Sequence, residues 1–372
     1  MRVPTRALPF ALALSLTVVV AACGGGQATP TTAPTKAPAA AAPTTAPAAP
    51  AATSAAPAAA APTKAAAPAG AAAPSPAPPT KEYKMSLATG GTSGTYYPYG
   101  GAIAGLLSKN IKGLTITAET TGASVENMRL LGTKQVEMAL TENDIADYSM
   151  NGTEMFKEKI TNFKAMAVLY PEVLQWVVTP EIKSLADLKG KAFVVGAAGS
   201  GTEANTRQVF DANGMTYKDL SKAPTVSFAE AASAYKDRQV DGFAVTGGVP
   251  TSAITDAATG RDLALLPLGG DVAKKTTDKY KFFVPVKIPA NSYKGQTADV
   301  DSIAVQSMLI VRDDVDPALV YWMTKTLIEK QPELAQAHAK GKELSKESAV
   351  KGLTIPLHPG AEQYYKEIGV IK

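Results

Sequence analysis

The chain has 372 residues, and its 37 basic side chains outnumber its 33 acidic ones by four. The whole excess lies in the first 80 residues, so residues 81–372 are formally neutral and offer no basic surface for nucleic acid. Roughly 290 residues follow that segment, which is enough for two lobes of ordinary size.

Residues 1–22 have the pattern of an export signal. Two arginines precede an apolar run that is too short for a membrane span, and small residues lead up to Cys23. These small residues resemble the lipobox of bacterial lipoproteins, which implies cleavage before Cys23 and attachment of lipid to it. Cys23 is the only cysteine, so no internal disulfide forms. An ordinary secretory signal with an incidental cysteine is the alternative.

Residues 23–80 are predicted to be the lipidated cysteine followed by a disordered tether. Residues 24–80 consist almost entirely of Ala, Pro, Thr, Ser and Gly. Such a segment has too few large apolar side chains to offset the entropy of ordering, and its prolines keep it extended. The sequence therefore predicts an extracytoplasmic domain that a lipid anchors to the cell membrane.

From residue 81 onward, strand-like and helix-like patterns alternate, which favours α/β architecture with mixed, mostly parallel sheets flanked by helices. The expected strands are residues 84–88, 114–119, 136–141, 165–170, 174–179, 192–196, 225–227 and 241–246. The expected helices are residues 100–110, 124–131, 142–151, 184–189, 201–213, 228–238 and 317–329.

Several helix starts are marked by capping residues. Ser200 with Glu203 and Ser227 with Glu230 both fit a capping box, and Pro317 follows three acids at a helix start. Those acids are interpreted as a cap and not as a metal site. Composition breaks near residues 177–181 and 284–289 are interpreted as two crossings between lobes. Residues 81–178 and 287–372 then form lobe 1, and residues 179–286 form lobe 2.

Residues 89–101 are the most informative segment, because TGGTSGTYYPYGG directly follows a strand and opens a helix. Glycines allow a tight turn, the hydroxyls of Thr92, Ser93 and Thr95 offer hydrogen bonds, and tyrosines offer flat walls. Free backbone N–H groups at a helix start suit an anion. The segment therefore predicts a site for a small acidic molecule, and a glycine-rich turn without a ligand is the alternative.

Similar Gly-, Ser- and Thr-rich turns follow four other expected strands, at residues 121–127, 141–144, 196–202 and 246–250. Ligands of open α/β sheets bind at the carboxyl ends of the strands. The turns of both lobes are therefore expected to meet in one cleft, although βα loops use these residues for turning in any case.

Patterns typical of enzymes are weak. His338 and His358 have no partner at metal-ligand spacing, and His358 lies in a proline-flanked turn. Residues 199–204 also fit the dinucleotide fingerprint G-x-G-x-x-A, but no acid ends the next expected strand. We therefore expect no enzyme activity, no cofactor and no metal, while paired carboxylates at unknown distances leave a secreted enzyme open.

The order of motifs resembles the TAXI family, the extracytoplasmic solute receptors of TRAP transporters. The resemblance covers nearly all of residues 81–372 and rests on the motifs GGTSGTYYPYGG, TGASVENMRLL, VEMALTENDIADYSMNG, IKSLADLKGKAFVVGAAGSGTEANTRQVF, VDGFAVTGGVP, VYWMTKTL and PLHPGAEQYY. It implies a two-lobed type II periplasmic-binding-protein fold with the ligand in the interlobe cleft. It also implies delivery of glutamate, glutamine or a similar carboxylate to a TRAP permease driven by an ion gradient.

The ligand-binding residues that the resemblance implies come from both lobes. Lobe 1 contributes Thr92, Thr95, Tyr96, Ser124, Asn127, Asn143 and Asp144, and lobe 2 contributes Ser200, Thr202, Gly247 and Gly248. The chain is accordingly predicted to be a monomeric solute receptor with a TRAP permease as its membrane partner. An ABC-transporter receptor of the same fold is the main alternative, followed by a sensory binding module and a secreted enzyme.

Overall fold

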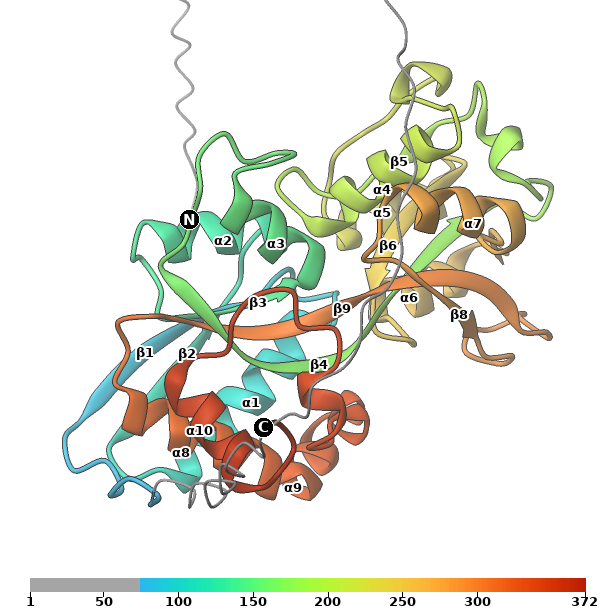
Figure 1. Cartoon of the computed structure of the whole chain (residues 1–372). Helices are drawn as coiled ribbons and strands as arrows, with labels where there is room; N and C mark the ends of the chain where they lie inside the picture. Colours follow the sequence, from blue (N-terminus) through green and yellow to red (C-terminus); the bar gives the residue numbers. More distant parts are fainter. Residues whose placement is uncertain (1–73) are drawn as a thin grey trace, which may run out of the picture. The chain divides into compact units, whose positions relative to one another are not determined.

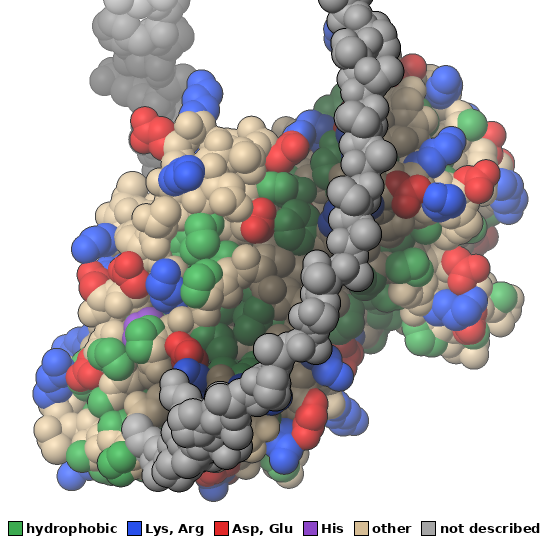
Figure 2. Space-filling view, viewed as in Figure 1, with side chains coloured by type: hydrophobic (Ala, Val, Ile, Leu, Met, Phe, Trp, Pro, Cys, Tyr) green, Lys and Arg blue, Asp and Glu red, His purple; other side chains and the backbone are tan. Residues whose placement is uncertain are grey.

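The computed structural model describes residues 74–372. The predicted signal peptide, the lipidated Cys23 and the tether up to residue 73 therefore lie outside the described residues. Within residues 74–372, no helix combines the length and hydrophobicity that crossing a membrane requires. On the face shown in Figure 2, basic and acidic side chains of these residues are interspersed, as their formal neutrality suggests.

The first lobe begins with three parallel strands in the order β2-β1-β3, with helices between them. Its sheet carries helices on both faces (Figure 1). Helices α2 and α3 bury side chains against one face, while α1 and the C-terminal helices pack on the other. The strands are β1 (Tyr83–Ala88), β2 (Leu114–Glu119) and β3 (Met138–Glu142), and the helices are α1 (Tyr96–Asn110), α2 (Ser124–Gly132) and α3 (Asn143–Asn151).

Two long antiparallel strands, β4 (Phe163–Val178) and β9 (Val300–Arg312), run from the first lobe into the second (Figure 1). The C-terminal half of β9 pairs with β3, whereas residues 173–178 of β4 pair with β6. Both strands are largely buried on both faces, because helices cover the sheet on each side. The single sheet thereby joins the two lobes in the order β2-β1-β3-β9-β4-β6-β5.

The second lobe forms around the distal halves of β4 and β9. Helices α4 and α7 pack on one face of its sheet, and α5 and α6 pack on the other. Its strands are β5 (Phe193–Val194), β6 (Gly242–Gly247), β7 (Ala264–Leu265) and β8 (Val284–Ile288). Its helices are α4 (Gly201–Ala212), α5 (Phe228–Lys236), α6 (Ser252–Gly260) and α7 (Gly270–Lys279), with 3₁₀ turns at Leu185–Leu188 and Tyr217–Asp219.

The chain then returns to the first lobe through α8 (Pro317–Glu329), α9 (Gln331–Ala337) and α10 (Pro359–Glu367), with 3₁₀ turns at Ala339–Glu343 and Ser348–Val350. Asp316 caps α8 through the N–H of Ala318, as the interpretation of the acidic run as a cap requires. His358 caps α10 through its Nδ1, which gives it a structural role. Gly360 lets α10 cross α8 closely, because a Cβ there would collide with the Pro317 carbonyl.

The predicted fold class is confirmed: the described chain is a two-lobed α/β structure of the type II periplasmic-binding-protein class, with a mixed sheet flanked by helices. The strands expected at 165–170 and 174–179 are one continuous strand, and residues 225–227 are not a strand. Strands β7, β8 and β9 and helices α6, α7, α9 and α10 were not predicted from the sequence.

The pairing of β8 places part of the segment that was expected in lobe 1 within lobe 2. Residues 287–304 were expected in lobe 1, but β8 pairs with residues 300–304, and Ile288 and Tyr293 are buried among side chains of α5 and α6. The strand pairs change partner near residue 172 of β4 and residue 305 of β9. We therefore propose that the two crossings lie inside these long strands.

The end of the predicted tether lies against the C-terminal helices. The carbonyl oxygen of Pro76 accepts a hydrogen bond from Trp322 Nε1 at 3.1 Å, and Ser75 Oγ lies 2.9 Å from the Tyr321 hydroxyl. The segment that was expected to be disordered up to residue 80 therefore has defined contacts from residue 74 onward.

Candidate functional site

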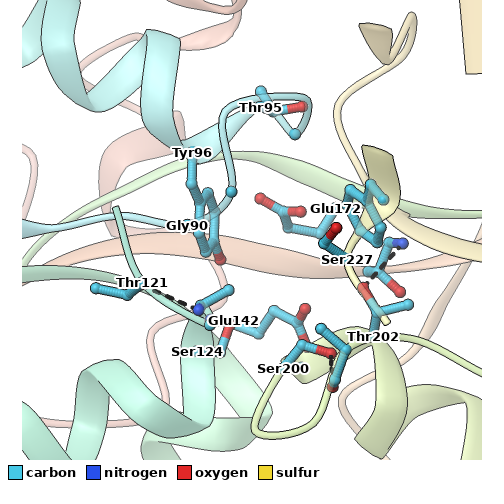
Figure 3. Close-up of a pocket in the computed structure, with 18 residues that line it drawn as sticks. Gly90, Thr95, Tyr96, Thr121, Ser124, Glu142, Glu172, Ser200, Thr202 and Ser227 are labelled. Carbon is cyan, nitrogen blue, oxygen red and sulfur yellow. Dashed lines mark hydrogen bonds between the residues drawn. The ribbon is translucent and has the colours of Figure 1, made fainter. Parts of the chain in front are cut away.

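A pocket opens between the two lobes, with about 650 Å³ of space outside the protein atoms. This figure includes solvent at the mouth of the pocket, so it is an upper limit on the space for a ligand. Four helices begin at its wall, α1 and α2 from the first lobe and α4 and α5 from the second (Figure 3). The lining residues are Gly90, Gly91, Gly94, Thr95, Tyr96, Thr121, Gly122, Ala123, Ser124, Glu142, Glu172, Ala197, Ser200, Gly201, Thr202, Ser227, Phe228 and Thr246.

The first-lobe wall is built by the turn between β1 and α1. Thr89 fixes the end of β1, since its N–H and its hydroxyl both donate to the Glu119 carbonyl. A Cβ at Gly100 would lie 2.5 Å from the Thr89 side chain, so the glycine lets α1 begin close to the strand. This places Thr95 and Tyr96 at the pocket, with the Tyr96 hydroxyl directed inward in Figure 3.

The second-lobe wall is built by the turn before α4. Gly196 and Gly199 have φ values of 111° and 76°, which only glycine adopts readily. Ser200 caps α4, because its Oγ accepts the N–H of Glu203 at 3.1 Å. Thr202 Oγ1 accepts the N–H of Thr246 at 3.2 Å, so the turn is tied to the end of β6. The Ser227–Glu230 capping box of α5 forms as predicted, whereas Glu203 bonds to Tyr217 instead of closing a box.

Two carboxyl groups, Glu142 at the end of β3 and Glu172 within β4, also line the pocket. Their exposed fractions are only 3% and 2%. Burial raises the pKa of Glu172 to about 8, although the hydroxyls of Tyr170 and Ser307 and the charge of Lys340 oppose the shift. Burial, with the charges of Asp144 and Glu172, raises the pKa of Glu142 well above its ordinary value. Burial raises the pKa of the Tyr96 hydroxyl in the same way.

The two lobes contact each other around the pocket. The N–H of Gly248 donates to Thr95 Oγ1 at 3.0 Å, and the N–H of Ala253 donates to the Ser93 carbonyl at 3.3 Å. On the other side, Asn205 Nδ2 donates to Asp144 Oδ2 at 3.1 Å and Gln208 Nε2 donates to the Tyr148 hydroxyl at 2.9 Å. These contacts describe a closed form of the cleft.

Five of the eleven ligand-binding residues predicted from the sequence line the pocket, namely Thr95, Tyr96, Ser124, Ser200 and Thr202. The other six lie elsewhere. Thr92 is exposed, and Asn127 donates to the carbonyl groups of Thr89 and Leu140, both at 2.7 Å. Asn143 bonds to the backbone of Gly352 and Gln306, Asp144 bonds to Asn205, and Gly247 and Gly248 lie behind the wall near Gln175.

Several lining residues were not among those predicted, namely Glu142, Glu172, Thr121, Ser227, Phe228 and Thr246. The sequence carried a signal for two of them. Glu142 belongs to the strand-end turn at residues 141–144, and Glu172 is a single acid between two strongly apolar runs. An acid in the middle of a buried strand is expensive unless it serves a purpose.

Replacing Ser200 by alanine is expected to lower the stability of the protein by about 1 kcal/mol, because α4 loses its N-cap. Urea unfolding of the purified protein measures the change. Ser200→Thr keeps a capping hydroxyl and should retain most of the stability. Equal stability of Ser200→Ala and the wild type would show that the cap contributes nothing.

Comparison with known protein families matches residues 87–369 to the NMT1-like family. The chain belongs to the NMT1-like family. The TAXI family, which the order of motifs resembles, is not the family that this match names. The narrower assignment of this NMT1-like chain therefore stays a prediction.

Solved structures similar to this NMT1-like chain include the alkanesulfonate-binding protein SsuA from Xanthomonas axonopodis pv. citri, 14% identical over 78% of this chain and 85% of its own, with a TM-score of 0.43. PhnD1 from Prochlorococcus marinus, in complex with methylphosphonate, is 11% identical over 77% of this chain and 99% of its own, with a TM-score of 0.47. A binding protein component of an ABC phosphonate transporter from Pseudomonas aeruginosa is 12% identical over 70% of this chain and 79% of its own, with a TM-score of 0.47. At this level of similarity, these names say nothing about the ligand of this chain.

Proposed function

We propose that the protein is an extracytoplasmic solute-binding receptor, which captures one small organic acid between its lobes for import. The observation that carries the proposal is the pocket itself, since four helices from both lobes begin at its wall. Free N–H groups at helix starts bind a carboxylate, and the hydroxyls around them add hydrogen bonds. A ligand that contacts both walls favours the closed form over an open one.

The membrane partner in this proposal is a permease, and we place an ABC-type importer first. The TRAP permease that was the first expectation from the sequence rests on the resemblance to the TAXI family alone, and the family match does not name that family. One of the similar structures is a binding protein component of an ABC phosphonate transporter. The lipid anchor at Cys23, which rests on residues 1–23 of the sequence, is part of the same proposal.

Binding of a carboxylate ligand is expected to stabilise the purified protein by about 2.7 kcal/mol at a concentration one hundred times its dissociation constant. Thermal unfolding with a panel of amino acids, dicarboxylates and oxoacids measures this, and native mass spectrometry detects a ligand that co-purifies. A panel without any shift, together with a protein free of small molecules, would contradict a receptor. Turnover of a bound compound would instead identify a secreted enzyme.

Uptake of the bound solute by whole cells separates the two permease classes. An ABC-type importer stops when its ATPase subunit is deleted, while a TRAP permease stops when the ion gradient is collapsed. Uptake that persists after deletion of the receptor would indicate a sensory module.

A further inference from the structure

Two acidic side chains from different strands, Glu142 of β3 and Glu172 of β4, meet in the pocket. Figure 3 shows the carboxyl groups of Glu142 and Glu172 within the pocket, between Tyr96 and the turn of Ser200 and Thr202. Both side chains are more than nine-tenths buried. Among residues 74–372, neither Glu142 Oε2 nor Glu172 Oε1 has a hydrogen-bond partner at good geometry, although the Tyr170 and Ser307 hydroxyls act on Glu172 and the Asn205 amide acts on Glu142. Buried acceptors of this kind need a donor.

The pocket supplies no positive charge of its own. Of the 18 lining residues, all within the described part of the chain, none is lysine, arginine or histidine. The amine of Lys340, which is not a lining residue, lies over the ring of Tyr170 at 5.8 Å from its centre and pairs with Glu343 at 2.6 Å. A second acid from the ligand would therefore meet two acids of the protein without a basic side chain in the pocket lining, and Lys340, whose charge acts on Glu172, is already paired with Glu343.

We propose that the ligand carries an ammonium group that Glu142 and Glu172 bind, so that the solute is an amino acid or a similar zwitterion and not a dicarboxylate. This inference rests on the proposed receptor function. The ammonium group supplies the donors that the free carboxyl oxygens lack, and its charge offsets theirs. The carboxylate of the same ligand meets the N–H groups at the helix starts that line the pocket.

Glu142 also links this binding to closure of the cleft. Its carboxyl group reaches from β3 to the first turn of α4, where a Cβ on Gly201 would collide with it. An ammonium group held by Glu142 therefore lies at the junction of both lobes.

Matched ligands that differ only in the amine test the proposal. The probes are L-glutamine against 4-carbamoylbutanoate, and L-leucine against 4-methylpentanoate, in calorimetric titrations of the purified protein. We expect an amino acid to bind at least 100-fold more tightly than its deaminated partner. Equal or tighter binding of the deaminated partner overturns the inference and leaves the receptor function standing. If no compound with or without an amine binds, and none co-purifies, both proposals fail.

Substitutions separate binding from folding. Glu142→Gln and Glu172→Gln should each weaken binding of the amino acid at least tenfold, while the melting temperature of the empty protein rises, since a buried acid has been removed. Glu203→Gln is the matched control, because this carboxyl lies in the same first turn of α4 but outside the pocket, where it bonds to Tyr217. If only Glu203→Gln loses affinity, or if none of the three variants does, Glu142 and Glu172 do not bind the ammonium group.

The sign of the pH dependence gives a readout that does not depend on a variant. The groups that face the two acids are Asp144, Tyr96, Tyr170 and Lys340. Since burial raises the pKa of both glutamates in the empty pocket, an ammonium ligand must drive protons off them. Binding should therefore tighten from pH 6 to pH 8 and release protons. Binding that weakens over this range and takes up protons would instead show that Glu142 and Glu172 stay protonated and contact an anionic group of the ligand.

Discussion

The ligand-free protein is expected to be less stable at pH 8 than at pH 6.5, by about 2–4 kcal/mol. Three buried acids cause this, because burial raises the pKa of Glu172 to about 8, that of Asp144 to about 7 and that of Glu142 well above its ordinary value. Between pH 6.5 and 8 the folded protein holds protons that the unfolded chain has already released. Their stabilising effect is complete below the unfolded pKa and is lost as the pH rises through the folded pKa. Each excess proton changes the free energy of unfolding by about 1.4 kcal/mol per pH unit.

Urea unfolding at intervals between pH 6.5 and pH 8 measures this slope. Burial lowers the pKa of His338 and His358, so the unfolded chain holds their protons more tightly and these two side chains oppose the slope at the low end of the window. Glu172→Gln removes one of the three protons and should flatten the slope while raising stability at pH 8. A wild-type protein whose stability is constant or rises over this window would show that the acids are ionised in the folded state.

The elements that the sequence predicted best are those whose signal is local. The strand at 114–119 and the helix at 317–329 have the predicted bounds in the structure, since their apolar spacing and their capping residues are contained within each segment. Strand β9 was missed although it joins the lobes. Its pairing partners, β3 and β4, lie far away in the sequence, and no local spacing records which strands will pair.

The same distinction separates the site residues that were predicted from those that were not. Ser200 and Thr202 lie on a turn that opens a helix, and the turn by itself marks them. Asn127 lies on a similar turn, but its amide serves the strand ends of Thr89 and Leu140. Whether a polar side chain faces a ligand or the backbone depends on neighbours that only the fold supplies. Glu172 belongs to the pocket because β4 continues from one lobe into the other.

Replacing Asn205 by aspartate is expected to weaken ligand binding about 100-fold at pH 8, through the closed form of the cleft. Asn205 of α4 donates to Asp144 of α3 at 3.1 Å, and both side chains are fully buried. The substitution keeps the shape of the side chain but replaces a donor with a second carboxylate. Breaking a buried polar pair so that a charge is left uncompensated costs about 3–5 kcal/mol, and 1.4 kcal/mol corresponds to tenfold in affinity. Calorimetry with the amino acid that binds most tightly in the titrations proposed above measures the affinity. Small-angle scattering measures whether the empty protein opens.

Two comparisons show whether the effect comes from charge between the lobes. At pH 5.5 the two carboxyls can share a proton, so the ratio of wild-type to variant affinity should shrink relative to pH 8. The exchanged double variant Asp144→Asn with Asn205→Asp restores one donor and one carboxylate across the same contact, and it should recover most of the wild-type affinity. A double variant as weak as Asn205→Asp alone would mean that the position of the charge matters. Asp144 would then act on Glu142, whose pKa its charge raises, and not as a latch between α3 and α4.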